Sequence, residues 1–246
     1  MKYKAFYEKG VQIIPNVLDQ EKINFYKKKI LEVYKKQVEE FGIEYLKITQ
    51  EENIVRSPFL YDSCFIELFY NDTTKCIVSE ILGEYAILSL QNAIFIPPKH
   101  IHHQTHYHRD LIHQEFTSSI PLSINLYYCL DDYDVSNGGT TFIFESHKKN
   151  KLQEKYKDST PNVSAGSIIL FDSMVYHKAG LNFSDQSRFG INNMFTLPFV
   201  KQQIRYPFCY PKTDDVKLNR ILGFESREYD SVKHFREYRL GRLKNE

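Results

Sequence analysis

The stretch Gly166-Ser167-Ile168-Ile169-Leu170-Phe171-Asp172 is a short apolar run that begins at a turn residue and ends in a carboxylate. Further short runs, apolar throughout or alternating, occupy the chain from residue 84 to residue 200. They are Tyr85–Leu90, Ala93–Ile96, Ile124–Leu130, Thr141–Phe144 and Phe189–Leu197. Turn residues such as Pro97-Pro98 and Asn137-Gly138-Gly139 separate them. Many short strands with turns between them predict a β-sandwich or barrel, of which the double-sheet jelly roll is one form.

The N-terminal third has the opposite pattern and is predicted to be helical. Asp19 is a suitable N-cap for a segment whose apolar residues recur at helical spacing. These residues are Ile23, Tyr26, Ile30 and Val33. A second helix is predicted from Cys64 to Leu82 and ends at Gly83, a residue type that commonly terminates helices. A short helix is also predicted near the C-terminus, over Ser231 to Leu243.

No internal repeat, low-complexity tract or linker divides the chain, and its 246 residues are enough for one large domain. We therefore expect a single domain over residues 1–246, mainly β with flanking helices. Its predicted parts are a helical N-terminal part over about 1–83, a jelly-roll core over about 84–200 and a C-terminal extension over about 201–246.

Composition narrows the classes of partner. The chain has 32 basic and 31 acidic side chains and a net charge of +1, which gives no electrostatic basis for binding nucleic acid or an anionic membrane. No apolar run approaches the roughly 20 residues of a membrane span. The N-terminus lacks a signal-like apolar segment, and the four scattered cysteines are typical of reduced thiols. We expect a cytoplasmic protein with a small-molecule partner, and the sequence leaves its oligomeric state open.

Six of the nine histidines fall within 14 residues, at positions 100, 102, 103, 106, 108 and 113. Within this cluster the spacing His108-Arg109-Asp110 is the one that matters, because residues i and i+2 of a strand point to the same face. His177 follows the strand predicted at 166–172 after a short turn. Two histidines and one carboxylate form the facial triad of non-heme Fe(II) oxygenases. We therefore predict His108, Asp110 and His177 as metal ligands.

Arg188 follows His177 by 11 residues and lies on a predicted strand. A guanidinium deep inside a barrel needs an anionic partner. Its planar fork matches a carboxylate held by two hydrogen bonds, such as the distal carboxylate of 2-oxoglutarate. We therefore predict Arg188 as the anchor of this cosubstrate.

Several motifs together resemble the phytanoyl-CoA dioxygenase family of the Fe(II)/2-oxoglutarate-dependent oxygenases, over most of the chain. The matching segments are Phe6–Leu18, His108-Arg109-Asp110, Leu130-Asp131-Asp132, Asn137-Gly138-Gly139, Glu145-Ser146-His147, Gly166-Ser167 and Arg220–Phe224, with His177, Asn182, Ser184 and Arg188 between the last two. The sequence departs from the family pattern at four positions outside the triad and the arginine. They are Arg109 for a common Gln, Tyr127 for a frequent Trp, Glu145 for Pro-Gly, and Ser167 for a frequent Asp.

The resemblance implies a double-stranded β-helix (jelly roll, cupin-like) with N-terminal helices. It implies Fe(II) held by His108, Asp110 and His177, and 2-oxoglutarate chelated to the metal with its distal carboxylate on Arg188. O2 is the oxidant, and succinate and CO2 are the co-products. In halogenating relatives a small residue replaces the carboxylate ligand, so Asp110 favours a hydroxylase.

Other positions are weaker candidates. Tyr127, Asn92 and Thr140 are predicted to line the cosubstrate pocket, and His106, Arg109 and His113 to contact the substrate. Asn182 and Ser184 are expected to order the loop after His177, and His147 to be structural. No cluster suited to the phosphates of coenzyme A is evident, so we expect a small metabolite, either a sugar derivative or a natural-product intermediate.

Two other interpretations remain. A non-catalytic jelly-roll binding module predicts a damaged triad or no anchor arginine, and neither defect is present. A cupin-type metalloenzyme of another class, such as an isomerase or a thiol dioxygenase, typically uses three or four histidines and needs no such arginine. His108-Arg109-Asp110 together with Arg188 therefore favours the oxygenase.

Overall fold

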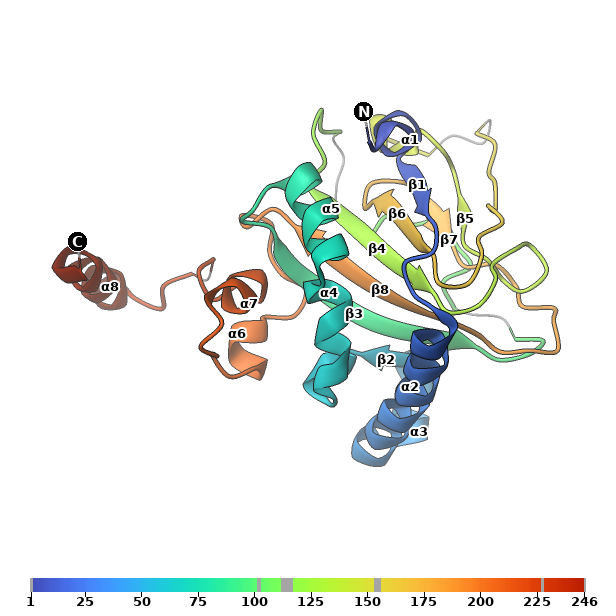
Figure 1. Ribbon diagram of the computed structural model, residues 1–246, viewed down its shortest axis with the longest axis horizontal. Helices are drawn as coiled ribbons and strands as arrows, with labels where there is room; N and C mark the ends of the chain where they lie inside the picture. Colours follow the sequence, from blue (N-terminus) through green and yellow to red (C-terminus); the bar gives the residue numbers. More distant parts are fainter. Residues whose placement is uncertain (1, 101–102, 112–116, 153–155, 227, 246) are drawn as a thin grey trace.

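The computed structural model describes residues 2–100, 103–111, 117–152, 156–226 and 228–245. A six-stranded antiparallel sheet has the order β1-β6-β4-β8-β3-β2, and a two-stranded sheet pairs β5 with β7 (Figure 1). The strands are β1 Val11–Ile14, β2 Ile54–Arg56, β3 Ile87–Ile96, β4 Ser123–Cys129, β5 Thr141–Phe142, β6 Ile168–Asp172, β7 His177–Lys178 and β8 Arg188–Thr196. The two sheets form the predicted double-stranded β-helix.

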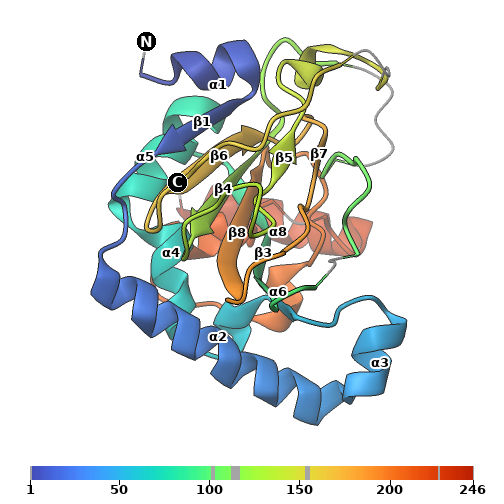
Figure 2. The same cartoon turned by 90° about the vertical axis from the view of Figure 1, so that its right-hand side faces the viewer.

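Helices pack on one face of the large sheet, and the last helix stands apart from it (Figure 1). The helices are α1 Lys4–Lys9, α2 Gln20–Phe41, α3 Ile43–Ile48, α4 Ile66–Tyr70, α5 Asp72–Leu82, α6 Tyr206–Cys209, α7 Val216–Ile221 and α8 Val232–Asn245. Short 3-10 turns lie at Pro58–Leu60, Ser63–Phe65 and Ser146–Lys148. Figure 2 shows α4 and α5 on one side of the large sheet and β5 and β7 on the other. Among the described residues, no helix is both long and apolar enough to span a bilayer.

Side chains along the central strands alternate between two hydrophobic cores. On β4, Leu126 and Tyr128 face the helices and belong to the main core. Tyr127 and Cys129 face the interior of the barrel and belong to a smaller core between the two sheets, which also holds Phe142. Each strand of the large sheet therefore supports the helices with one face and the interior of the barrel with the other.

The predicted helix from Asp19 is confirmed as α2. The Asp19 carboxylate accepts a hydrogen bond from the Lys22 amide at 2.8 Å, as an N-cap does. The single helix predicted from Cys64 to Leu82 is wrong, because the chain breaks at Asn71 into α4 and α5. Asn71 has extended backbone angles and caps α5 through its side chain, and Gly83 ends α5 as predicted.

The predicted strands are present with shifted ends. The runs Tyr85–Leu90 and Ala93–Ile96 join into the single long strand β3, which carries a register shift between Leu88 and Leu90. Strand β1 was not predicted, and it pairs with β6 at the edge of the large sheet. All four cysteines are free, as predicted.

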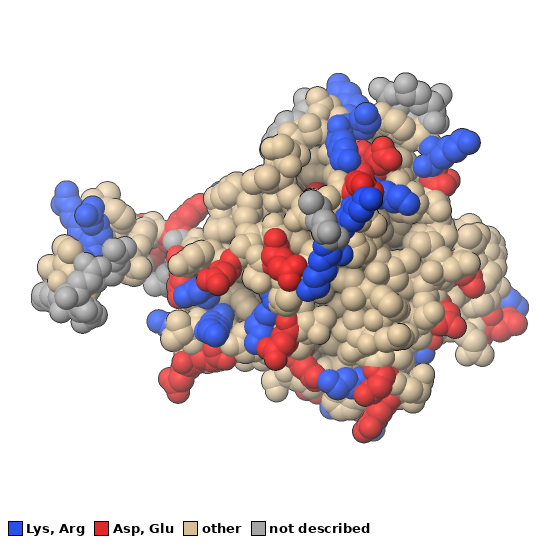
Figure 3. Space-filling view, turned by 45° about the horizontal axis from the view of Figure 1, so that its top comes forward, with Lys and Arg blue, Asp and Glu red and all other residues tan. Residues whose placement is uncertain are grey.

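The surface carries charges of both signs. On the face drawn in Figure 3, basic and acidic side chains are interspersed rather than gathered by sign. Helix α8 extends away from the sheets as a separate arm (Figure 1) and leaves Val232 and Leu243 exposed. Among its described residues, this face therefore carries no large patch of one sign, in keeping with the net charge of +1.

Replacing Asn71 with Ala is expected to lower the free energy of unfolding by about 1 to 2 kcal/mol. The change removes the bonds from the Thr74 amide at 2.9 Å and to the Glu67 carbonyl at 2.8 Å. Urea unfolding of this variant is compared with Asp72→Ala, which removes only a solvent-exposed ion pair with Lys75. Equal losses in the two variants would contradict the capping role of Asn71.

Candidate active site

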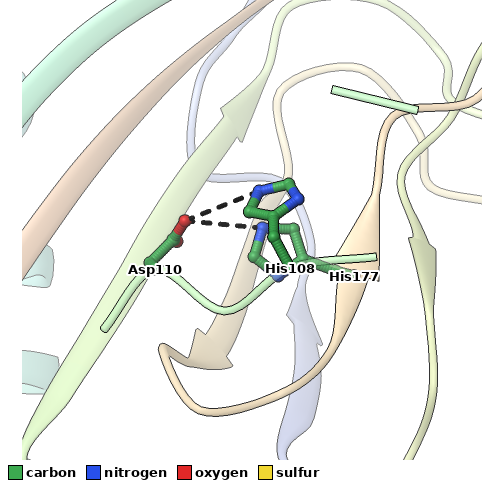
Figure 4. A group of neighbouring side chains, drawn as sticks. All are labelled: His108, Asp110 and His177. Carbon is green, nitrogen blue, oxygen red and sulfur yellow. Dashed lines mark ion pairs between the residues drawn. The ribbon is translucent and has the colours of Figure 1, made fainter. Parts of the chain in front are cut away.

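The structure brings the three predicted ligands together. One ligand atom from each of His108, Asp110 and His177 lies within 4.8 Å of the others. Asp110 Oδ1 is 3.8 Å from His108 Nε2 and 3.6 Å from His177 Nε2. Figure 4 shows the carboxylate facing both rings. The group offers two nitrogens and one oxygen on one side, which is the donor set expected for a facial Fe(II) site.

Backbone hydrogen bonds hold these residues in register. The amides of His108 and His177 each donate to the other residue's carbonyl at 3.0 Å, which forms an isolated antiparallel bridge. The Asp110 amide donates to the Ser173 carbonyl at 3.0 Å. The regular strand expected around His108-Arg109-Asp110 is therefore wrong, because a single bridge replaces it. The chain still presents both side chains to one point.

Each histidine presents the same nitrogen to the site. Nδ1 of His108 lies 3.0 Å from the His106 carbonyl, and Nδ1 of His177 lies 3.0 Å from the Val175 carbonyl. A carbonyl can only accept, so both Nδ1 atoms carry the proton and both Nε2 atoms keep a free lone pair. Burial lowers the pKa of His177, which favours the neutral imidazole that a metal requires.

The carboxylate also fits a metal. Asp110 Oδ2 is buried and finds no hydrogen-bond partner within the described part of the chain. A buried carboxylate oxygen without a partner is costly. A cation held between Asp110 and the two Nε2 atoms would remove that cost, so the described residues fit a divalent metal.

The cluster opens onto a cavity of about 490 Å³ between the sheets. Its lining contains every predicted metal and cosubstrate residue, namely His108, Asp110, His177, Arg188, Tyr127, Asn92 and Thr140. Phe142, Ile169 and Phe171 supply apolar wall beside them. Residues from six separate segments of the sequence are thus gathered around one space.

Arg188 is buried at the start of β8, with 3% of its surface exposed. Its guanidinium stacks on the Tyr133 ring, 4.1 Å from the ring centre. Nε and Nη1 are buried without hydrogen-bond partners, and no described carboxylate pairs with the charge. A buried cation of this kind requires an anion, and the free N–H groups match the two oxygens of a carboxylate.

Two tyrosines and a glycine shape the space beside Arg188. The Tyr133 hydroxyl donates to the Phe189 carbonyl at 2.9 Å and lies 3.2 Å from the Tyr127 hydroxyl. A Cβ added at Gly190 would come within 2.3 Å of the Tyr133 hydroxyl and 2.5 Å of the Tyr127 hydroxyl. Tyr133 was not predicted, because it lies outside the predicted strands, in an isolated bridge with Val163, and matches no motif. Gly190 in the middle of a predicted strand was a usable signal of close approach.

Of the remaining candidates, Arg109 contributes to the cavity lining but directs its charged group elsewhere. The Arg109 guanidinium turns toward the 146–150 segment, where it donates to the carbonyls of Ser146 at 2.9 Å and Asn150 at 3.3 Å and to that of Lys149. His106 has an exposed ring outside the cavity lining and contributes its carbonyl to His108. His113 lies outside the described residues.

Asn182 orders the loop before β8, as predicted. Its Nδ2 donates to the carbonyls of Ile96 and Pro97, each at 3.0 Å, and of Gln186 at 2.8 Å. Its Oδ1 accepts from the amide and hydroxyl of Ser184. The residue is almost fully buried and ties the end of β3 to the segment that leads to Arg188.

Residues 6–190 match the model of the phytanoyl-CoA dioxygenase (PhyH) family. The chain belongs to this family. PhyH proteins are Fe(II)/2-oxoglutarate-dependent oxygenases, so Fe(II), 2-oxoglutarate and O2 are the cofactors, and the chain is an oxygenase-type enzyme that acts on a small molecule. "Uncharacterized protein Rv1501" of Mycobacterium tuberculosis and "Uncharacterized protein Mb1539" of Mycobacterium bovis are each 28% identical to this PhyH protein, covering 94% of it and 91% of their own length.

Solved structures share the PhyH fold at low sequence identity. The non-heme alpha ketoglutarate dependent epimerase SnoN from nogalamycin biosynthesis has a TM-score of 0.62 and 16% identity, covering 83% of this chain and 85% of its own. The non-heme monooxygenase ThoJ, as its Ni complex, has a TM-score of 0.64 and 15% identity, with coverages of 82% and 79%. The carbocyclase SnoK from the same biosynthesis has a TM-score of 0.60 and 16% identity, with coverages of 79% and 83%. These likenesses establish a shared fold.

Replacing Gly190 with Ala is expected to lower the free energy of unfolding by about 1 to 3 kcal/mol, because the new methyl group collides with both tyrosine hydroxyls. Gly241→Ala is the matched control, since nothing lies within 4 Å of a Cβ at that position in α8. Thermal or urea unfolding of both variants measures the difference. A Gly190→Ala protein as stable as the control would show that the tyrosines do not need this space.

Asp172, at the end of β6, produces a pH dependence of stability. Burial raises its pKa from the usual 3.8 to about 6, against the opposing effects of the Met174 amide and the Arg109 charge. The folded state holds this proton more tightly than the unfolded state, so stability falls as pH rises from about 4 to about 6. Asp172→Asn removes this titration. The free energy of unfolding of the variant minus that of wild type should therefore rise by about 1 kcal/mol from pH 5 to pH 7.5. Urea unfolding at the two pH values tests this, and a constant difference would contradict it.

Proposed function

We propose that this PhyH protein hydroxylates a small-molecule metabolite, with His108, Asp110 and His177 holding Fe(II) and Arg188 binding the distal carboxylate of 2-oxoglutarate. One observation carries the proposal. The buried guanidinium of Arg188, which pairs with no carboxylate among the described residues, and the His-Asp-His cluster line the same cavity. A metal site alone would not need that cation, and an anion site alone would not need the cluster.

Bound Fe(II) and 2-oxoglutarate supply the oxidising power, since the keto acid and O2 become succinate and CO2 while one oxygen atom enters the substrate. The protein's own residues bind and orient. The two histidines present neutral Nε2 atoms, and Asp110 brings the negative charge that offsets part of the metal charge. Arg188 pairs with the far end of the cosubstrate and so orients its keto acid end toward the cluster.

The cavity lining next to Arg188 is largely aromatic and aliphatic. Phe142, Ile169, Phe171 and Tyr127 belong to the lining, and Tyr133 stacks on the Arg188 guanidinium. Because Arg188 is buried, the attraction between its guanidinium and a carboxylate is stronger there than in water. Tyr127 and Thr140 are therefore assigned to the cosubstrate pocket.

Hydroxylation is favoured over halogenation because Asp110 occupies the carboxylate position of the cluster. For the substrate class, SnoN and SnoK act in the biosynthesis of the natural product nogalamycin. They support a natural-product intermediate as the substrate here, and a sugar derivative is the other substrate class that we propose. We further propose that residues 1–246 form one catalytic domain that works in the cytoplasm, consistent with four free cysteines. The alternative, a non-catalytic or differently catalytic cupin-type metal-binding protein, leaves the Arg188 charge without an assigned partner.

Anaerobic addition of Fe(II) and 2-oxoglutarate to the metal-free protein tests the proposal. The visible charge-transfer absorption of the keto acid chelated to iron is expected in wild type and should be lost in His177→Ala. Arg188→Ala should weaken 2-oxoglutarate binding by a factor of about 10 or more, because a buried charge pair is lost. Lys99→Ala is the control, because Lys99 is exposed, pairs with Asp185 and is not part of the cavity lining. Failure of wild type to bind 2-oxoglutarate in the presence of iron would refute the proposal.

A further inference from the structure

Two asparagines lie side by side on the inner face of the large sheet. Asn92 on β3 and Asn192 on β8 are directly opposed partners in the antiparallel ladder, and both line the cavity. Opposed residues of this kind have Cβ atoms about 5 Å apart. Asn192 Oδ1 is buried and has no hydrogen-bond partner among the residues that the structure describes. A buried amide oxygen without a donor is costly, so this atom requires a ligand group.

A series of hydrogen bonds starts at the side-chain nitrogen of Asn192 and fixes its orientation. Its Nδ2 donates to Asn125 Oδ1 at 2.7 Å, and Asn125 Nδ2 donates to Ser173 Oγ at 2.9 Å. The Ser173 hydroxyl donates to Ser123 Oγ at 2.8 Å, and the Ser123 hydroxyl donates to the Phe195 carbonyl at 2.8 Å. The two serines and Asn125 are fully buried. We call these four polar side chains, Asn192, Asn125, Ser173 and Ser123, the polar relay.

The last acceptor determines the direction of the whole polar relay. The Phe195 carbonyl can only accept, so the Ser123 hydroxyl must donate to it and can only accept from Ser173. Ser173 then accepts from Asn125, which must turn its Nδ2 toward Ser173 and its Oδ1 toward Asn192. Asn192 must therefore use Nδ2 for the polar relay and keep Oδ1 as its unpaired acceptor.

Asn92 has the complementary polarity. In the amide orientation that pairs both of its polar atoms, Asn92 Oδ1 accepts from Arg56 Nη1 at 2.7 Å and Nδ2 donates to the Gln91 carbonyl at 2.9 Å. Arg56 is itself held by Glu51, whose carboxylate accepts from Nε at 2.7 Å. The oxygen of Asn92 is thus occupied, and its second Nδ2 proton is the polar group left for a ligand.

We propose that Asn92 and Asn192 form a substrate subsite that binds a hydroxyl group, which accepts from Asn92 and donates to Asn192. The inference rests on the proposed function and narrows its substrate to a compound with a free alcohol. A hydroxyl both donates and accepts through one atom, as this pair of amides requires. Ketones, ethers and carboxylates only accept, and an ammonium group only donates.

The cosubstrate does not satisfy this subsite. At neutral pH, 2-oxoglutarate has two carboxylates and a ketone, all of which are acceptors, so none of its groups can pair with Asn192 Oδ1. The subsite therefore belongs to the other molecule that must share the cavity, the substrate. A water at Asn192 is the competing occupant, and an experiment separates the two.

The test uses the protein loaded with Fe(II) and 2-oxoglutarate without O2, and measures binding by titration calorimetry. The probes are glycerol, cis-cyclohexane-1,2-diol and methyl glucopyranoside, each compared with its fully O-methylated counterpart. Wild type should bind at least one alcohol about tenfold more tightly than its ether. Asn192→Leu should weaken that alcohol about tenfold, which corresponds to about 1.4 kcal/mol, and leave 2-oxoglutarate affinity within about twofold.

Ser123→Ala provides a second variant that keeps Asn192. It removes the hydroxyl that fixes the direction of the polar relay, so the two amides can turn and present Nδ2 to the cavity instead. The preference for alcohol over ether should then fall toward one while 2-oxoglutarate binding persists. A residue with a merely structural role would not change this ratio.

The outcomes separate the subsite from the oxygenase proposal. If wild type fails to bind 2-oxoglutarate with iron present, the proposed function falls, and the subsite falls with it. If 2-oxoglutarate binds but no alcohol is preferred over its ether, the subsite alone is overturned. The same holds if Asn192→Leu leaves alcohol binding unchanged, since Asn192 then holds a water only.

Discussion

The buried charge of Arg188 is the constraint on which the inner half of the barrel depends. A guanidinium enclosed by protein is tolerated only where aromatic faces and an anion replace water. Tyr133 supplies the aromatic face, and Gly190 leaves room for it and for Tyr127. Asn182 ties down the loop that delivers Arg188 to the start of β8. The shape of this end of the cavity thus follows from placing one cation where a dicarboxylate can reach it.

The metal cluster shows which part of the site was predictable from the sequence. The spacing of His108 and Asp110 and the order of His177 and Arg188 along the chain are visible in the sequence, and the resemblance to the PhyH family gives them roles. The regular strand expected around His108 and Asp110 is absent from the described chain, and one backbone bridge to His177 takes its place. Local spacing identified the ligands, but long-range hydrogen bonds produce their geometry.

The parts of the fold that escaped prediction have a common cause. Strand β1 is short and forms only because β6 offers it an edge, and the helix break at Asn71 depends on a cap that competes with helical propensity. Tyr133 acts through a stack on a residue far along the chain. Asn125 and Asn192 were detectable in principle, as polar residues at inward positions of apolar strands, but their pairing needs the register of β4 against β8. Contacts between distant segments carry this information, and composition and periodicity do not.

Ser173 connects the polar relay with the His-Asp-His cluster. Its hydroxyl belongs to the polar relay that orients Asn192, and its carbonyl accepts the amide of Asp110 at 3.0 Å. The acceptor proposed for a substrate hydroxyl and the carboxylate proposed for the metal are therefore positioned from one residue. An oxygenase that oxidises one chosen carbon must hold the substrate at a fixed distance from its metal, since small misplacements cost much of the rate. A shared anchor of this kind links that distance to the backbone of Ser173 through a short series of buried side chains.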